Sequence, residues 1–190
     1  MKAFVRWPFL KVVLAVFSLL LLFNFIRGVN KKPISQNQVL SQTASGLPVR
    51  LKIPIIHVDA AIQDVGVNSK GEMEVPSNTA DVGWFKLGPQ PGETGSAVIS
   101  GHFDGKNGEA GVFTNLHRLK VGDKIYVEDG KGATTTFAVR ESRTYNLGYA
   151  EEVFSSNDSS HLNLITCDGI WDGVKKSYSK RLVVFADVLN

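Results

Sequence analysis

Short alternations of apolar and polar residues dominate the chain after about residue 49. Turns rich in Gly, Pro, Asn and Asp separate six such runs: VRLKIPII, AVISGHF, KIYVED, TTTFAVRES, HLNLITC and RLVVFADVL. A period of two residues is typical of β-strands, and no long period of 3.6 residues accompanies it. The pattern therefore predicts a mainly β domain, built as a sandwich or a barrel.

One segment departs from this pattern. In GVFTNLHRL, the apolar residues Phe113, Leu116 and Leu119 are spaced three apart. Residues at that spacing share one face of a helix. The sequence therefore predicts one or two short helices in an otherwise β domain.

The N-terminal part of the chain contains a different kind of apolar run. Val12–Ile26 is almost wholly apolar, and the stretch from Trp7 to Ile26 is 20 residues long with only Lys11 charged. That length suits a membrane-spanning helix, whereas a cleaved signal peptide is shorter in its apolar part and ends in a small-residue cleavage site, which is absent after this run. Of these two alternatives we expect an uncleaved anchor in residues 1–29, with a transmembrane helix at about 7–26. The protein would then be a single-pass protein of the cell membrane with its folded domain outside.

A polar segment follows the anchor. Residues 30–48 are rich in Ser, Gln and Asn and contain no acidic residue. Such a composition is typical of a flexible linker. We therefore expect one folded domain, residues 49–190, tethered close to the membrane.

The distribution of charge changes the meaning of the net charge. The chain has 21 basic and 18 acidic residues, but six of the basic ones lie in residues 1–32, which leaves 15 basic against 18 acidic residues in the rest. A nucleic-acid surface needs clustered Lys and Arg in the folded part. The charge therefore argues against a nucleic-acid partner.

The single cysteine, Cys167, ends the run HLNLITC and precedes an Asp-Gly turn. One cysteine excludes an intrachain disulfide, so Cys167 is a reactive thiol, half of an intermolecular bridge or a small buried apolar residue. A reactive thiol needs a nearby base and a nearby positive charge, because the thiolate is the nucleophile.

His102 is the strongest candidate for the base. It follows the strand-like run AVISG and lies between glycine-containing turns, where a side chain can project from a rigid scaffold. Simpler roles fit the other three histidines: a packed strand residue for His57, a solvated helix end for His117, and a strand start or loop cap for His161.

Arg181 is the candidate for the cation. It begins RLVVFADVL, in which strand alternation puts Arg181, Val183 and Phe185 on one face. At the start of a strand it is either a solvated edge residue or a residue at the rim of a site beside Cys167. In the second case its planar donors can bind a substrate carbonyl or an oxyanion.

Taken in order, these segments resemble the sortases, which are membrane-anchored cysteine transpeptidases. The resemblance covers roughly residues 49–189 and rests on five segments: LKIPIIHVDAAI, PGETGSAVISGH, VFTNLHRLKVGDKIYV, LNLITC and RLVVFA. It is closest to the class F sortases. It implies an eight-stranded β-barrel that brings His102, Cys167 and Arg181 together.

The resemblance also implies a role for each residue. Cys167 would be the nucleophile, His102 its general acid and base, and Arg181 the group that orients the substrate and stabilises the oxyanion. The substrate would be the LPxTG-like sorting signal of a secreted protein. The acceptor would be an amine of a peptidoglycan precursor or of a pilin lysine. No cofactor and no metal are implied.

Four residues are candidates for substrate contact: Ile165, Thr166, Trp171 and Tyr178. Residues 168–180, between the cysteine and arginine strands, are expected to form a loop that either walls a peptide groove or packs on its own aromatics. Asn163 stands where many sortases have threonine and should share a strand face with Ile165 and Cys167, so we expect a difference in pocket shape or in local hydrogen bonding. The acidic segment DGKNGE, residues 104–109, lacks the ligand spacing of a calcium loop and is interpreted as a turn.

Two rival functions remain. An L,D-transpeptidase would share the cell-wall setting, but its S-x-G-C motif is absent because Leu-Ile-Thr precedes Cys167. A membrane-tethered binding module without catalysis would hold Cys167 as an inert buried thiol.

Overall fold

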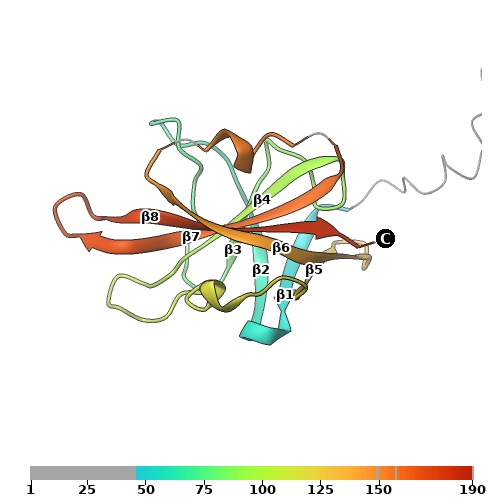
Figure 1. Ribbon diagram of the computed structural model, residues 1–190, viewed down its shortest axis with the longest axis horizontal. Coiled ribbons are helices and arrows are strands. Elements are labelled where there is room, and N and C mark those ends of the chain that lie inside the picture. The colour runs from blue at the N-terminus through green and yellow to red at the C-terminus, as the bar shows by residue number, and fades with distance from the viewer. Residues whose placement is uncertain (1–45, 149, 157, 190) are drawn as a thin grey trace, which may run out of the picture. The chain divides into compact units, whose positions relative to one another are not determined.

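A computed structural model describes residues 46–148, 150–156 and 158–189 of the chain. Eight strands form a closed barrel in the order β1-β2-β3-β4-β7-β8-β6-β5 (Figure 1). Their bounds are β1 Pro48–Ile53, β2 Val58–Val65, β3 Val82–Phe85, β4 Gly95–Gly101, β5 Lys124–Asp129, β6 Thr134–Asn146, β7 Ser160–Asp172 and β8 Ser177–Val188. The predicted eight-stranded barrel is confirmed.

Two parallel strand pairs set the topology of this barrel. β2 runs parallel to β3 and β4 runs parallel to β7, whereas all other neighbours are antiparallel. Parallel neighbours end at the same edge of a sheet. The segments that follow β4 and the C-terminal half of β7 therefore meet at one end of the barrel.

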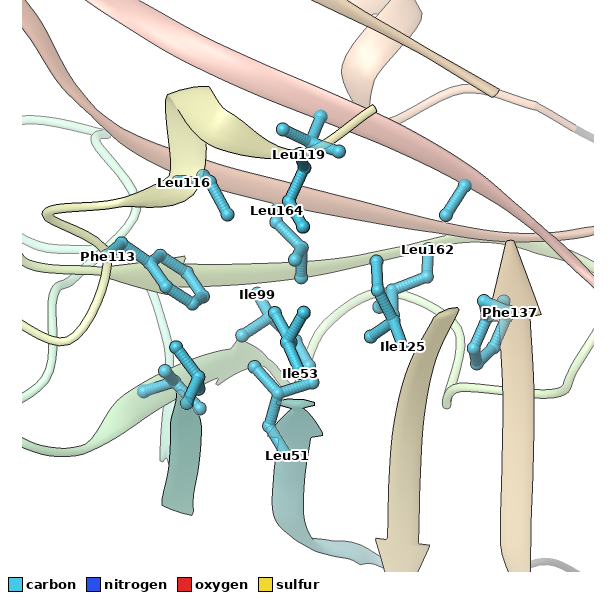
Figure 2. Close-up of a cluster of buried hydrophobic side chains, with 14 of the residues drawn as sticks. Leu51, Ile53, Ile99, Phe113, Leu116, Leu119, Ile125, Phe137, Leu162 and Leu164 are labelled. Carbon is cyan, nitrogen blue, oxygen red and sulfur yellow. The ribbon is translucent and has the colours of Figure 1, made fainter. Parts of the chain in front are cut away.

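The barrel interior is filled by apolar side chains from every strand and from the segment after β4. Figure 2 shows large members of this core cluster pointing toward one another: Leu51, Ile53, Ile99, Phe113, Leu116, Leu119, Ile125, Phe137, Leu162 and Leu164. Burial of each such side chain stabilises the fold by about 1.5–3 kcal/mol. The predicted face of Phe113, Leu116 and Leu119 is confirmed, because all three are buried in this cluster.

The helices are few and short. Three single-turn 3-10 helices occur in the described residues, one more than expected: η1 Pro54–Ile56, η2 Leu116–Arg118 and η3 Glu151–Val153. The prediction that His57 is a packed strand residue was wrong. His57 is exposed and left-handed, with φ of 59°, because the chain must reverse between β1 and β2 directly after the turn that Pro54 begins. His117 is exposed at the end of η2, as expected.

The segment between Cys167 and Arg181 is a β-hairpin. The prediction of a loop over residues 168–180 was wrong, because β7 continues to Asp172 and β8 begins at Ser177. A bulge after Asp168 includes Gly169 at φ of 83°, where an added Cβ would lie 2.4 Å from the Ser179 hydroxyl oxygen. This position therefore requires glycine, and the bulge bends the strand. Beyond it the hairpin continues past the barrel, as Figure 1 shows on its left side.

The expected anchor, residues 1–29, and almost all of the expected linker lie outside the described residues. Within the described part of the chain, no helix is long and apolar enough to cross a membrane.

Candidate active site

Cys167 lies on the outer face of β7, at the end of the barrel where β4 also ends. Leu162 and Leu164 point into the core cluster, while Ile165 belongs to a second apolar cluster outside the barrel. Alternation along the strand then assigns Cys167 to the outer face and Thr166 to the inner one. The thiol is partly buried. The nucleophile candidate is therefore held on a rigid strand next to solvent.

Strand register brings the other two candidates to the level of Cys167. Arg181 is the direct cross-strand partner of Cys167 in the antiparallel pair of β7 and β8. In the parallel pair of β4 and β7, Ser100 is level with Ile165, and two further steps bring His102 level with Cys167. The Thr166 hydroxyl donates a 2.9 Å hydrogen bond to the Gly101 carbonyl, which continues this alignment beyond the last ladder pair. The three candidates thus lie on, or directly after, three adjacent strands.

The segment after β4 fixes the position of His102. The backbone N–H of Phe113 donates to the His102 carbonyl at 2.9 Å, and the N–H of Gly111 donates to Phe103 at the same distance. An added Cβ on Gly111 would lie 2.2 Å from the His102 carbonyl oxygen, so this close approach requires glycine. Residues 103–111 therefore form a small closed loop that leaves His102 at its base.

The imidazole of His102 has a defined partner in the loop between β2 and β3. Its Nε2 lies 3.0 Å from the carbonyl oxygen of Pro76, which is buried. A carbonyl can only accept, so Nε2 carries the proton and donates it in this contact. In the neutral ring Nδ1 is then the nitrogen with a lone pair, able to accept a proton from a thiol.

A network of hydrogen bonds holds that β2–β3 loop. Asp81 accepts from Asn78 at 2.7 Å and from Gln63 at 2.8 Å, and Gln63 in turn accepts from the N–H of Ser77 at 3.1 Å. The bonds from Asn78 and Gln63 hold the pKa of Asp81 below its ordinary value. The ionised Asp81 carboxylate therefore supports the turn that presents the Pro76 carbonyl.

Arg181 is tied to the hairpin that contains it. Its Nη1 donates to the carbonyls of Tyr178, at 3.1 Å, and Lys180, at 2.8 Å, and its Nη2 donates to the Ser177 hydroxyl at 3.2 Å. These bonds keep the charge of Arg181 beside Cys167. The expected place at the rim of the site agrees with this geometry.

The pKa of the Cys167 thiol reflects three opposing influences. Burial is the largest and raises the pKa, the positive charge of Arg181 lowers it, and the negative charge of Asp104 raises it. Their net effect is a Cys167 pKa above the ordinary value for cysteine. At neutral pH the resting site therefore holds mainly the thiol, and a base is needed when the thiol reacts.

The four candidates for substrate contact differ in their exposure. Ile165 is partly buried in the second apolar cluster, whose buried members are Val98, Val153, Val183 and Phe185. Thr166 is 3% exposed and bonded to Gly101, so it offers a substrate little surface. Trp171 is 53% exposed, and its ring lies 5.3 Å from that of Tyr178 in an edge-to-face contact. Their contact with a substrate stays a prediction.

Asn163 lies on the same strand face as Ile165 and Cys167, as expected. Its side-chain nitrogen donates a 2.6 Å hydrogen bond to the carbonyl of Val153 in η3, and Asn163 is 1% exposed. This bond holds the segment between β6 and β7 over the outer face of β7. The asparagine therefore fixes η3 against β7, four positions before Cys167.

Two groups at the site were not predicted from the sequence, namely the Asp104 carboxylate and the Pro76 carbonyl. The segment 104–109 is a turn, as interpreted, with Gly108 donating to the Gly105 carbonyl at 3.0 Å, but Asp104 also accepts a hydrogen bond from the hydroxyl of Tyr178. The other group is the Pro76 carbonyl. The position of Asp104 two residues after His102 was a usable signal, whereas no sequence pattern marks a backbone carbonyl.

His161 has a structural role at the start of β7, as expected. Its two ring nitrogens contact Asp187 at 2.7 Å and Asp158 at 2.9 Å, and it is 7% exposed. It lies six positions before Cys167 along β7, a distance of about 20 Å. In the described part of the chain no group of three or more His, Cys, Asp or Glu side chains is placed to hold a metal ion.

Comparison with known proteins gives consistent results. A family model described as the sortase domain matches residues 51–189. Sortase C-1 from Actinomyces oris is 27% identical, with a TM-score of 0.59 over 75% of this chain and 71% of that one. A lid mutant of sortase A from Corynebacterium diphtheriae is 23% identical, with a TM-score of 0.60 over 79% and 74% of the two chains.

Sortase C1 of pilus island 1 of Group B Streptococcus is 22% identical, with a TM-score of 0.57 over 75% of this chain and 64% of that one. At this level of identity the likeness extends to the fold alone. No curated protein matches the chain. The comparisons favour neither the L,D-transpeptidase nor the inert binding module.

Proposed function

The chain belongs to the sortase family, and on that premise we propose that Cys167, His102 and Arg181 form its catalytic centre. The enzyme is a cysteine transpeptidase. The observation that carries the assignment of residues is the strand register, in which Arg181 is directly opposite Cys167 and His102 follows at the same level from β4.

The first half-reaction cleaves the donor peptide. Nδ1 of His102 takes the thiol proton as Sγ of Cys167 attacks the scissile carbonyl carbon, and the carbonyl oxygen becomes an oxyanion that the Arg181 guanidinium stabilises. The C–N bond then breaks. The leaving amine takes the proton from His102, and the acyl group remains on Cys167 as a thioester.

The second half-reaction transfers the acyl group. An acceptor amine attacks the thioester carbonyl, a new C–N bond forms, and the bond to Sγ breaks. His102 accepts the proton that the amine loses and returns it to the thiolate. No cofactor is needed, because each step exchanges one acyl group and one proton.

Substrate and acceptor follow from family resemblance. The donor is an LPxTG-like sorting signal of a secreted protein. The acceptor is an amine of a peptidoglycan precursor or a pilin lysine. The closest subclass by sequence pattern is class F. The solved structures named above are class C and class A enzymes, so the subclass stays a prediction.

An N-terminal membrane anchor in residues 1–29 completes the proposal. An enzyme tethered at the outer face of the cell membrane meets exported substrates at a raised effective concentration. The apolar run and its basic flanks in the sequence support this location.

Mass spectrometry of the full chain tests the function directly. After incubation with a pooled library of LPxTG-like peptides, Cys167 should bear an acyl adduct, and added amine should remove the adduct and give a ligated peptide. Cleavage retained by Cys167→Ala would overturn the proposal. So would the absence of adduct and cleavage across the library with folded protein.

A further inference from the structure

A hydrogen bond joins the segment after β4 to the hairpin of β7 and β8. The hydroxyl of Tyr178 donates to the carboxylate of Asp104, 74 positions away in the sequence. The Tyr178 ring also contacts two other rings edge to face, those of Phe103 at 5.6 Å and Trp171 at 5.3 Å. Both side chains of the pair are partly buried. Tyr178 is therefore held by contacts from both segments.

This contact lies between two residues of the proposed catalytic centre. Asp104 is two residues after His102, in the closed loop of residues 103–111. Tyr178 is three residues before Arg181, and its carbonyl accepts a hydrogen bond from Arg181 Nη1 at 3.1 Å. One tyrosine thus contacts the His102 segment through its hydroxyl and the arginine through its backbone.

We propose that Asp104 and Tyr178 are a pair of positioning residues, which holds the His102 segment against the Arg181 hairpin and sets the electrostatic potential at Cys167. The inference rests on the proposed catalytic centre and adds two residues to it. Neither residue is required to touch the reacting atoms.

The charges around Cys167 explain why the pair affects reactivity. Asp104 and His102 face it from the segment after β4, and Arg181 and Tyr178 face it from β8. Asp168 is next along β7, and its carboxylate accepts from the Thr144 hydroxyl of β6 at 3.1 Å. Asp104 and Arg181 act on the thiol with opposite signs, so the balance between them determines how readily the thiolate forms.

Tyr178 contributes to this balance as a neutral donor. The hydrogen bond to Asp104 raises the pKa of the Tyr178 phenol to about 12, so the phenol keeps its proton throughout the physiological range. A donated proton partly compensates the charge of the carboxylate that accepts it. Tyr178 therefore weakens the effect of Asp104 on Cys167 while fixing its position.

Two conservative substitutions should shift Cys167 in opposite directions. Asp104→Asn removes the negative charge but keeps an acceptor for the phenol, so the Cys167 pKa should fall. Tyr178→Phe keeps the ring contacts but removes the donor, so the charge of Asp104 acts on the thiol uncompensated and the Cys167 pKa should rise. A purely structural role would give the same sign for both variants.

The test measures alkylation of Cys167 by iodoacetamide in the full chain, followed by mass spectrometry between about pH 6 and pH 11. At a fixed pH below the plateau, Asp104→Asn should react about threefold to tenfold faster than the unsubstituted protein. Tyr178→Phe should react about twofold more slowly. Tyr178→Phe should also lose about tenfold in kcat/KM for peptide cleavage, because the His102 segment and the Arg181 hairpin are no longer joined by this hydrogen bond.

Matched controls remove the same groups elsewhere. Asp59→Asn on β2 removes a carboxylate, and Tyr126→Phe on β5 removes a phenol hydroxyl. Neither should move the alkylation profile. Shifts of equal sign in Asp104→Asn and Tyr178→Phe, or profiles that match the controls, would overturn the inference.

Two measurements separate this inference from the proposed function and from misfolding. Alkylation does not require turnover, so its pH profile tests the pair even if no peptide is cleaved. Thermal unfolding of each variant checks the barrel. If Tyr178→Phe unfolds early, the Asp104→Asn profile still decides, because an unchanged profile in a folded Asp104→Asn protein would overturn the inference.

Discussion

Arg181 lies directly opposite Cys167 across the antiparallel pair of β7 and β8, and its guanidinium is bonded to the backbone of the same hairpin. The cation is therefore placed by strand register and by two carbonyls, and its position does not depend on a flexible side chain alone. A preorganised charge stabilises a developing oxyanion without reorganisation during the reaction.

Replacement of Arg181 by alanine should lower kcat/KM for peptide cleavage by about 10²–10³-fold. Arg181→Lys should recover part of that loss, because lysine supplies the charge but cannot reproduce the planar pattern of donors. Steady-state kinetics check this result. Arg118→Ala, which removes an exposed arginine from η2, is the control. A lysine variant as inactive as the alanine variant would show that geometry alone matters.

The raised pKa of Cys167 predicts a particular pH dependence in the unsubstituted protein. Since burial favours the neutral thiol, the alkylation rate should rise about tenfold per pH unit and continue to rise above pH 8.5, the approximate ordinary pKa of a thiol. The contribution of Cys167 to the free energy of unfolding should be complete below that pH. It should be lost as pH increases and the thiol ionises.

Alkylation rates measured across this range, with Cys167→Ala as the blank, check the first statement, and urea unfolding at each pH checks the second. A plateau already reached at neutral pH would show instead that the resting protein holds a preformed thiolate.

Gly169→Ala should disturb the hairpin. Its φ of 83° and the 2.4 Å approach to the Ser179 hydroxyl leave no room for a Cβ. We expect a loss of about 1–2 kcal/mol in the free energy of unfolding, together with a lower kcat, because the bulge lies between Cys167 and Tyr178.

Gly173→Ala in the same hairpin is the matched control, since its nearest contact is the Trp171 indole nitrogen at 3.9 Å. Urea unfolding and peptide cleavage are the measurements. Equal effects of the two substitutions would contradict the importance of the bulge.

Asn163→Ala should detach η3 from the outer face of β7. The Val153 carbonyl would lose its side-chain donor in a buried place, which costs about 1–3 kcal/mol. Limited proteolysis should then cut the segment between β6 and β7 faster than in the unsubstituted protein. Asn115→Ala, at the start of η2 and without a side-chain cap bond, serves as control. Unchanged proteolysis would show that apolar contacts alone hold the segment.

Much of the barrel could be predicted from the sequence. Alternation placed six of the eight strands, and it assigned the two faces of β8 correctly, since Leu182 and Val184 lie in the core cluster while Val183 and Phe185 lie outside it. β2 and β3 gave weaker signals. β3 is only four residues long, and β2 begins directly after the turn at His57, so neither stood apart from its surroundings.

The candidate site was predictable as a set of residue types but not as a set of contacts. Cys167, His102 and Arg181 each carried a chemical signal in the sequence. The hairpin that replaced the expected loop depends on the pairing of residues such as Trp171 and Tyr178 across strands, which alternation within one strand does not reveal. The contact of the Pro76 carbonyl with His102 and that of Asp104 with Tyr178 became visible only when the fold brought distant segments together.

The order of strands in the chain has a consequence for biosynthesis. His102 directly follows β4 and Cys167 lies on β7, but Arg181 lies on β8, the last strand of the barrel in chain order, which pairs with both β7 and β6. In a nascent chain, the positive charge of Arg181 cannot lie beside the thiol until this final strand has inserted. Until the barrel closes, Cys167 therefore lacks the cation beside it, and the proposed catalytic centre is completed only by the last strand.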